Sequence, residues 1–214
     1  LNQLGANAYF KSDPDSAVRY WRQNLQLDER VLGPNHPDLA STLNNLARVM
    51  IEQRRYREAL PLLTRSANIY LAQREDTHDD LAFIFANLAL AKKGVGATSE
   101  AEILFRRALK SAQVHDNRLI APIQTDLADL LCARRQFGEG LALLDRAAPL
   151  MKERYPDQAW RPAWVANTRG ACLVRQGDSK GRELIRSSAP VILERWKPET
   201  LYGFEVERRL GKTG

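Results

Sequence analysis

Residue types that build active sites and metal centres are scarce in this sequence. Its 214 residues include two cysteines and three histidines, and neither Cys132 nor Cys172 stands in a C-x-x-C or other metal-ligand spacing. No nucleophile motif and no glycine-rich phosphate loop is present. We therefore predict a chain that is not an enzyme, with no catalytic residues, no metal and no cofactor. Both cysteines are expected to be buried thiols in a reducing cytoplasm.

Long apolar runs and blocks of like charge are also missing. No stretch approaches the roughly 18 apolar residues of a membrane span, so no membrane association is expected. The net charge is +6, from 32 basic and 26 acidic residues, but the basic side chains are dispersed among acidic ones. A solvated surface with a basic bias explains this better than a stripe that binds nucleic acid. The short basic groups are Arg54, Arg55 and Arg57; Arg106, Arg107 and Lys110; and Arg134 and Arg135.

What the sequence does contain is an internal repeat with a period near 42 residues. Ala17, Ala59 and Ala101 are each 42 residues apart, and a fixed period of roughly 20–50 residues indicates a repeat architecture. In the central unit two apolar stripes with helical spacing flank a polar turn at 53–56. Each unit is therefore expected to be two antiparallel helices that bury their stripes against neighbouring units. The stripes are Leu43, Leu46, Ala47 and Met50, and then Ala59, Leu60, Leu63 and Ala67.

This repeat resembles the tetratricopeptide repeat, whose pattern is W-x2-L-G-x2-Y, then A-x3-F, then P. The matching residues of the central unit are Leu43, Leu46, Ala47, Met50, Ala59 and Leu63. The period of 42, with the phrase LGPNHPD at 32–38, is similar to the kinesin-light-chain type of the family. The resemblance covers nearly the whole chain, although the period shortens to 39 at the fourth unit. It implies an all-α fold: a right-handed α-solenoid of about five tetratricopeptide helix pairs plus a C-terminal capping helix.

The whole chain, 1–214, is expected to form one repeat array. Because it begins on Leu1, inside a repeat helix, we expect a piece of a longer protein. Asp13 followed by Pro14 predicts a helix start. Pro149 and Pro190 fall inside second helices, where they predict a kink or an early helix end, and looser packing in the last third. The expected units are roughly 1–38, 39–80, 81–119, 120–159 and 160–195, with a capping helix at 199–211.

The candidate site follows from the family resemblance. In such arrays the first helix of each pair lines the concave surface, so its polar positions would form a ladder there. An asparagine amide offers donors and an acceptor, and can hold the backbone of an extended peptide. Arg48 lies early in this ladder and Asp126 and Asp129 later, which suits a ligand with an acidic and a basic part. The predicted peptide-binding residues are Gln3, Asn44, Asn45, Arg48, Asn87, Asp126, Asp129 and Asn167. The alternative is that the asparagines hydrogen-bond neighbouring repeats.

Two further residue groups have competing interpretations. The histidines fall about one period apart, on different stacked units, so we interpret them as turn residues rather than metal ligands: His36, His78 and His115. The tryptophans near the C-terminal units either fill space where those units deviate, which we favour, or form an exposed anchor for a partner: Trp160, Trp164 and Trp196.

The predicted function is a non-enzymatic protein–protein interaction module. It would bind a peptide or protein segment in its concave groove, as the scaffold or sensor part of a larger cytoplasmic protein. The alternative is a nucleic-acid-associated or self-associating array that uses its dispersed arginines and lysines. Binding to nucleic acid would fall steeply with salt, and the interleaved acidic residues count against it. Self-association through the truncated first helix stays open.

Overall fold

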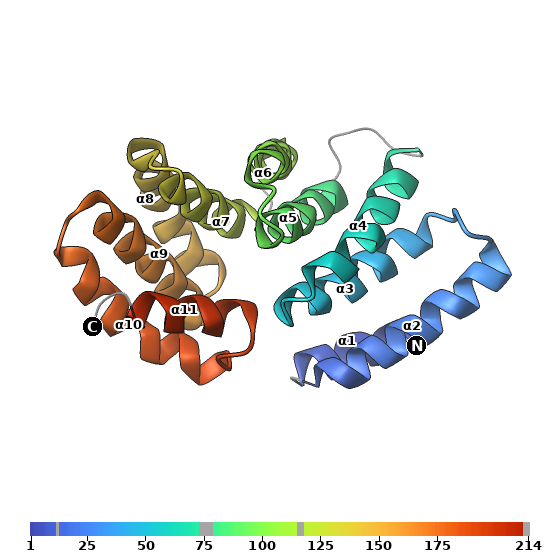
Figure 1. The fold of residues 1–214 in the computed structure, drawn as a ribbon. Helices are drawn as coiled ribbons and strands as arrows, with labels where there is room; N and C mark the ends of the chain where they lie inside the picture. Colours follow the sequence, from blue (N-terminus) through green and yellow to red (C-terminus); the bar gives the residue numbers. More distant parts are fainter. Residues whose placement is uncertain (12, 73–78, 115–117, 212–214) are drawn as a thin grey trace. The chain divides into compact units, whose positions relative to one another are not determined.

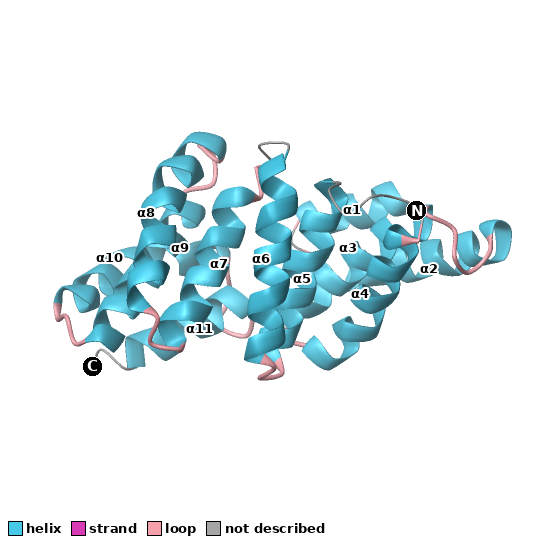
Figure 2. Cartoon of the chain, turned by 90° about the horizontal axis from the view of Figure 1, so that it is seen from above, coloured by secondary structure: helices cyan, strands magenta, loops and turns pink. Residues whose placement is uncertain are grey.

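The computed structural model describes residues 1–11, 13–72, 79–114 and 118–211, and every regular element in these ranges is an α-helix (Figure 2). This confirms the predicted all-α fold. No helix in the described ranges is long and apolar enough to cross a membrane. The helices are α1 (Asn2–Phe10), α2 (Pro14–Leu32), α3 (Asp38–Glu52), α4 (Tyr56–Leu71), α5 (Asp79–Gly94), α6 (Thr98–Val114), α7 (Ile120–Ala133), α8 (Phe137–Arg154), α9 (Trp160–Gln176), α10 (Lys180–Arg195) and α11 (Leu201–Gly211).

The helices form two compact units, Leu1–Ser111 and Ala112–Gly214, called unit 1 and unit 2 below. In unit 1, α1 packs against α2, and α3 packs against both α4 and α5 (Figure 1). Helix α6 contacts α5 through Arg107, whose guanidinium lies 4.2 Å from the centroid of the Phe85 ring. Helix α3 therefore contacts its own second helix and the next first helix, which is the packing that the repeat predicts.

Small residues set the close helix contacts of unit 1. Ala17, Ala59 and Ala101, one period apart, are completely buried. Gly5 has the same role, because a Cβ at this position would lie 2.6 Å from Nε1 of Trp21. Each such residue lets two helices approach and bury the larger side chains beside them.

Helix α2 begins where the sequence predicts it. Pro14 is its first residue, and the Asp13 side chain accepts a hydrogen bond of 3.0 Å from the backbone N–H of Ser16. Hydrogen bonding to the Ser16 side chain, and then to its backbone N–H, favours the charged carboxylate and so lowers the pKa of Asp13. The cap satisfies one of the amide groups that a helix start leaves without a partner.

Four turns between paired helices, those that follow α3, α5, α7 and α9, each contain one residue with a left-handed backbone. In unit 1 these are Arg54, with φ +60°, and Gly96, with φ +86°; in unit 2 they are Arg135, with φ +64°, and Gly177, with φ +97°. The four positions are separated by 42, 39 and 42 residues, so they are equivalent in the repeat. The same turn is thus built twice with glycine and twice with arginine.

Of the two outcomes predicted for the late prolines, a kink or an early helix end, the early end does not occur, and the kink stays a prediction. Helix α8 runs through Pro149 and α10 runs through Pro190, as α4 does through Pro61. All three prolines are exposed. A proline deprives the carbonyl four residues earlier of its helical partner, but on the solvent side water can bond that carbonyl, so the helix continues.

Unit 2 ends in an aromatic cluster covered by α11. Helix α7 packs against α8 and α9, and α10 packs against α9 and α11. Trp164 and Trp196 are buried together with Tyr202 and Val206 of α11. The tryptophans therefore fill the core, as favoured from the sequence, and the segment predicted as a capping helix is helical.

The expectation of two free thiols is also wrong. Cys132 of α7 and Cys172 of α9 form a disulfide, and both residues are completely buried. Cys132 and Cys172 lie one repeat apart, and the packing of α7 against α9 brings them together. Disulfides persist in oxidising environments. The cysteines therefore give no support for a reducing cytoplasm, and the cytoplasmic location stays a prediction.

Candidate peptide-binding site

The asparagine ladder exists in unit 1, but it is largely internal. The Asn87 amide donates to Oδ1 of Asn44 at 3.0 Å, and Arg48 donates to Oδ1 of Asn87 at 3.2 Å. Arg48 also donates to Glu52 at 2.9 Å, and the Tyr9 hydroxyl donates to the same carboxylate oxygen at 2.6 Å. Asn44 and Asn87 are buried, with 3% and 1% of their surface exposed. For this pair the alternative interpretation, hydrogen bonding between neighbouring repeats, describes the structure.

The predicted rungs of unit 2 are covered by the protein itself. Arg209 of α11 donates to Oδ1 of Asp129 at 2.8 Å and to Oδ1 of Asn167 at 2.7 Å. Its guanidinium lies 4.5 Å from the centroid of the Trp164 ring. Burial lowers the pKa of Arg209, and the charge of Asp129 acts in the opposite direction. Asp129 also accepts a bond of 3.3 Å from Arg175, so Asp129 and Asn167 form a polar core rather than an open surface.

Besides Arg48, which is half-buried, three of the predicted residues remain accessible. Gln3 is exposed and donates to the Asn7 side chain at 3.2 Å. Asn45 and Asp126 are half-buried. Of these three, Asn45 lines a cleft.

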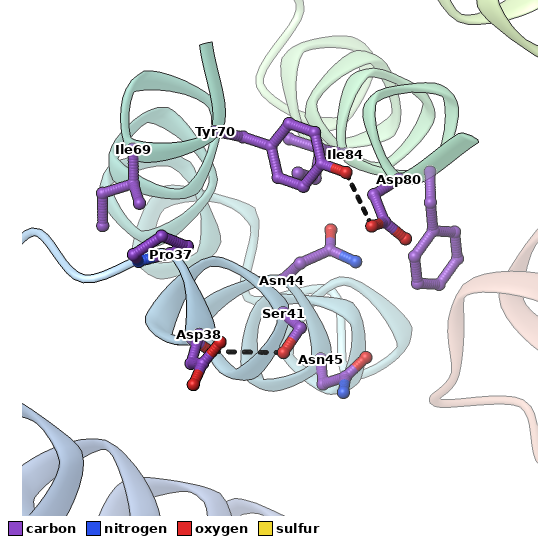
Figure 3. Close-up of a pocket in the computed structure, with 10 residues that line it drawn as sticks. Pro37, Asp38, Ser41, Asn44, Asn45, Ile69, Tyr70, Asp80 and Ile84 are labelled. Carbon is purple, nitrogen blue, oxygen red and sulfur yellow. Dashed lines mark hydrogen bonds between the residues drawn. The ribbon is translucent and has the colours of Figure 1, made fainter. Parts of the chain in front are cut away.

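That cleft lies in unit 1, between the N-terminal halves of α3 and α5 and the end of α4 (Figure 3). Its volume is about 290 Å³. The Tyr70 hydroxyl points across it and donates to Oδ2 of Asp80 at 2.7 Å. The lining residues are Pro37, Asp38, Ser41, Asn44, Asn45, Ile69, Tyr70, Asp80, Phe83 and Ile84. An apolar wall therefore faces amide and carboxylate groups, a combination that suits a segment of polypeptide.

Sequence reasoning missed most of this lining. It found Asn44 and Asn45, because they lie between the apolar positions of a first helix. It missed Tyr70, which closes a second helix, and Asp38 and Asp80. A signal for the two aspartates was present, because they are 42 residues apart and each lies in the first turn of a first helix.

The histidines show no metal site in the described part of the chain. Nδ1 of His36 accepts a bond of 3.3 Å from the backbone N–H of Asp38, at the start of α3. No group of three or more potential metal ligands occurs among the described residues. His78 and His115 lie outside these residues.

Comparison with known proteins identifies the repeat. The sequence profile described as tetratricopeptide repeat matches residues 1–72, which include the first two helix pairs. Residues 1–72 therefore carry tetratricopeptide repeats. Folds of this family generally mediate protein–protein interactions.

Solved tetratricopeptide-repeat structures show the same fold. The nearly identical TPR-like repeats of a protein assigned as a kinesin light chain in Podosopora anserina superpose with a TM-score of 0.68 at 17% identity, covering 90% of this chain and 93% of that one. A Rap protein complexed with competence and sporulation factor gives a TM-score of 0.66 at 15% identity, covering 99% of this chain and 62% of that one. At these identities the likeness establishes the fold alone, and it confirms the predicted α-solenoid fold class.

Curated tetratricopeptide-repeat proteins match part of the chain. Human "Tetratricopeptide repeat protein 19, mitochondrial" is 26% identical over 122 residues, which are 56% of this chain and 31% of that protein. The rat protein of the same name is 25% identical over 131 residues, which are 61% of this chain and 35% of that protein. The match therefore spans about a third of the length of these relatives.

Proposed function

We propose that this tetratricopeptide-repeat chain is a non-enzymatic interaction module that holds an extended peptide segment in the cleft of unit 1. The observation that carries the proposal is the pairing of amide and carboxylate groups with an apolar wall in one cavity. Half-buried Asn45 can bond a peptide backbone whatever its sequence. Each such bond contributes only about 1 kcal/mol net, so Phe83 and Ile84 would supply the apolar contacts.

The charge of the cleft indicates which segment suits it. The lining contains two carboxylates, Asp38 and Asp80, and no basic side chain. A peptide with a basic side chain opposite these groups fits better than an acidic one. The Rap protein complexed with competence and sporulation factor supports a binding role for this fold. Within a longer protein, such a module would act as a scaffold or a sensor.

Selection from a library of random 12-residue displayed peptides against the whole chain would test this proposal. Binding of a selected peptide is then measured by fluorescence anisotropy to the wild type and to Asn45→Ala. Loss of one hydrogen bond should weaken binding about fivefold without changing the helical circular dichroism signal. Gln23→Ala, an exposed amide on α2 outside the cleft, is the matched control and should bind like the wild type. If Asn45→Ala and Asp38→Asn both bind the selected peptide as tightly as the wild type, the proposal is contradicted.

Self-association is a second candidate, favoured by the surface of the first helix pair. Leu4 of α1 and Leu27 and Val31 of α2 are 47%, 51% and 70% exposed. Exposed apolar side chains at this density mark interaction surfaces. If copies of the chain associate here, sedimentation velocity should show a dimer that Val31→Glu dissociates. A monomer at all protein concentrations would exclude this candidate.

A further inference from the structure

Two arginines of unit 2 stack on the same tyrosine. Tyr155 directly follows α8, Arg118 precedes α7, and Arg161 lies in the first turn of α9. The guanidinium carbons of Arg118 and Arg161 lie 5.0 and 4.2 Å from the centroid of the Tyr155 ring. The two carbons can therefore be no farther apart than the sum of these distances. We call Arg118, Tyr155 and Arg161 the arginine–tyrosine cluster.

The arginine–tyrosine cluster is held in place by the rest of unit 2. Tyr155 is buried, and its hydroxyl donates a hydrogen bond of 2.8 Å to the backbone carbonyl of Arg118. The guanidinium of Arg161 also lies 4.7 Å from the centroid of the Trp160 ring, and its Nε–H donates to Oε1 of Gln158 at 2.6 Å. An arginine whose position is already fixed loses less conformational entropy when it binds a ligand.

The positive charge of this cluster is not neutralised by a contact within the chain. In the part of the chain that the structure describes, no carboxylate forms an ion pair with Arg118 or Arg161. Asp157, in the turn before α9, is exposed and pairs with neither of them. By contrast, Arg169 of α9 pairs with Asp145. Because Arg118 is exposed and Arg161 half-buried, the cluster offers two guanidinium groups to an anion from solution.

The repeat relates this cluster to the peptide cleft of unit 1. At the intervals of 42, 39 and 42 residues that separate the equivalent turns, Asp38 and Asp80 correspond to Leu119 and Arg161. The two aspartates line the cleft of unit 1, where Tyr70 donates to Asp80. At the corresponding place in unit 2, a tyrosine again follows a second helix, but an arginine replaces the aspartate. The charge there is reversed, so it favours an anionic ligand.

We propose that the arginine–tyrosine cluster binds the phosphate group of a phosphoserine or phosphothreonine in a partner protein. Such a group carries about 1.5 to 2 negative charges at pH 7, which matches two guanidinium groups, whereas one carboxylate would leave an arginine unbalanced. Guanidinium groups bind phosphate oxygens bidentately, and arginine clusters are a general means of recognising phosphorylated protein segments.

A protein is a better partner for this cluster than a nucleic acid. Folds of the tetratricopeptide-repeat family generally mediate protein–protein interactions. Glu153 and Asp157, both exposed, stand two residues before and after Tyr155 in the sequence. These carboxylates would repel the successive phosphates of a nucleic acid, but a protein segment with one phosphate can avoid them.

A chemical-shift titration of the isotope-labelled whole chain tests the proposal, with a seven-residue glycine–alanine peptide that carries one central phosphoserine as the probe. The indole N–H resonance of Trp160, whose ring stacks on Arg161, should move as the peptide is added. Arg118→Gln removes an exposed guanidinium, so it should weaken binding about tenfold or more and leave the melting temperature unchanged. Arg146→Gln, the same change at an exposed arginine of α8, is the matched control and should bind like the wild type.

Any of four results would overturn the proposal. Equal weakening in Arg118→Gln and Arg146→Gln would mean that the peptide responds only to net charge. Equally tight binding of the same peptide with glutamate in place of phosphoserine would mean that the cluster binds acidic side chains in general. A twelve-residue oligothymidylate that binds more tightly than the phosphopeptide at equal salt would assign the cluster to nucleic acid. No shift of the Trp160 resonance at millimolar peptide, or unchanged binding in Arg118→Gln, would mean that the stacked arginines act only within the fold.

Discussion

Removal of the Cys132–Cys172 disulfide should destabilise unit 2 by an amount that follows from the loop it closes. The two cysteines are 40 residues apart. Closing a loop of this length removes about 13 cal/mol/K of entropy from the unfolded chain, or about 4 kcal/mol at 25 °C. Both sulfur atoms are fully buried, so Cys→Ala replacement adds a smaller packing loss. The double variant Cys132→Ala/Cys172→Ala should therefore lose about 4 kcal/mol or somewhat more.

Urea unfolding with and without a reducing agent measures this difference. The wild type should unfold at a markedly lower urea concentration when the agent is present during unfolding. The double alanine variant should show one midpoint in both conditions, because it has no bond to reduce. This variant separates the effect of the disulfide from any effect of the reducing agent on the rest of the chain.

Either of two observations would refute the predicted stabilisation by the disulfide. If a thiol reagent titrates two free cysteines in unfolded protein that was never reduced, the bond is absent. If the bond is present but reduction leaves the urea midpoint unchanged, loop closure does not stabilise unit 2, and the other contacts between α7 and α9 hold these helices together.

The other predictions concern single side chains, each measured by thermal or urea unfolding. Asp13→Ala should lower the melting temperature at pH 7. The pKa of Asp13 is depressed in the folded chain, so its contribution to stability is complete above the unfolded pKa and is lost as the pH falls through the folded pKa. The melting temperatures of wild type and variant should therefore become equal in acid. A constant difference down to pH 2 would contradict this. Arg209→Met should cost about 3 kcal/mol, since it removes the guanidinium that is paired with buried Asp129 at 2.8 Å. Arg208→Met, a change in a partly exposed neighbour, should alter stability little, and similar losses in both variants would refute a special role of the buried arginine. Gly94→Ala should lower the free energy of unfolding by about 2 kcal/mol through its clash with Tyr56. Gly138→Ala, where a Cβ meets nothing within 4 Å, should stabilise α8 by up to about 1 kcal/mol. Unchanged stability in Gly94→Ala would mean that the Tyr56 ring moves aside.

The fold could be predicted from the sequence because its determinants are local and repeated. The spacing of Leu43, Leu46 and Ala47 defines one face of a helix, and the 42-residue period places the next helix pair against it. The start of α2 could be predicted as well, because Asp13 and Pro14 determine it within a single helical turn. The prolines misled because their effect depends on which face of the helix they occupy, and the period alone does not give that face.

The candidate site could be predicted only in part, because a polar side chain on a first helix has two possible partners. Asn45 lines a cleft, whereas Asn44 and Asn87 bond each other. Nothing local distinguishes these outcomes. Arg209 follows Asp129 by 80 residues, and no sequence pattern around either residue predicts their ion pair. The cysteine pair could have been predicted more easily, because residues one period apart on neighbouring first helices tend to lie close together.

The bond between Asp129 and Arg209 also sets an order of events during synthesis. Domains fold from the N-terminus as they are made, at roughly 5–20 residues per second. The 80 residues between the two partners therefore separate their translation by roughly 4–16 s. Arg175 of α9, which also donates to Asp129, is made 46 residues after it. Unit 2 can therefore complete the buried ion pair between α7 and α11 only after α11 has been made.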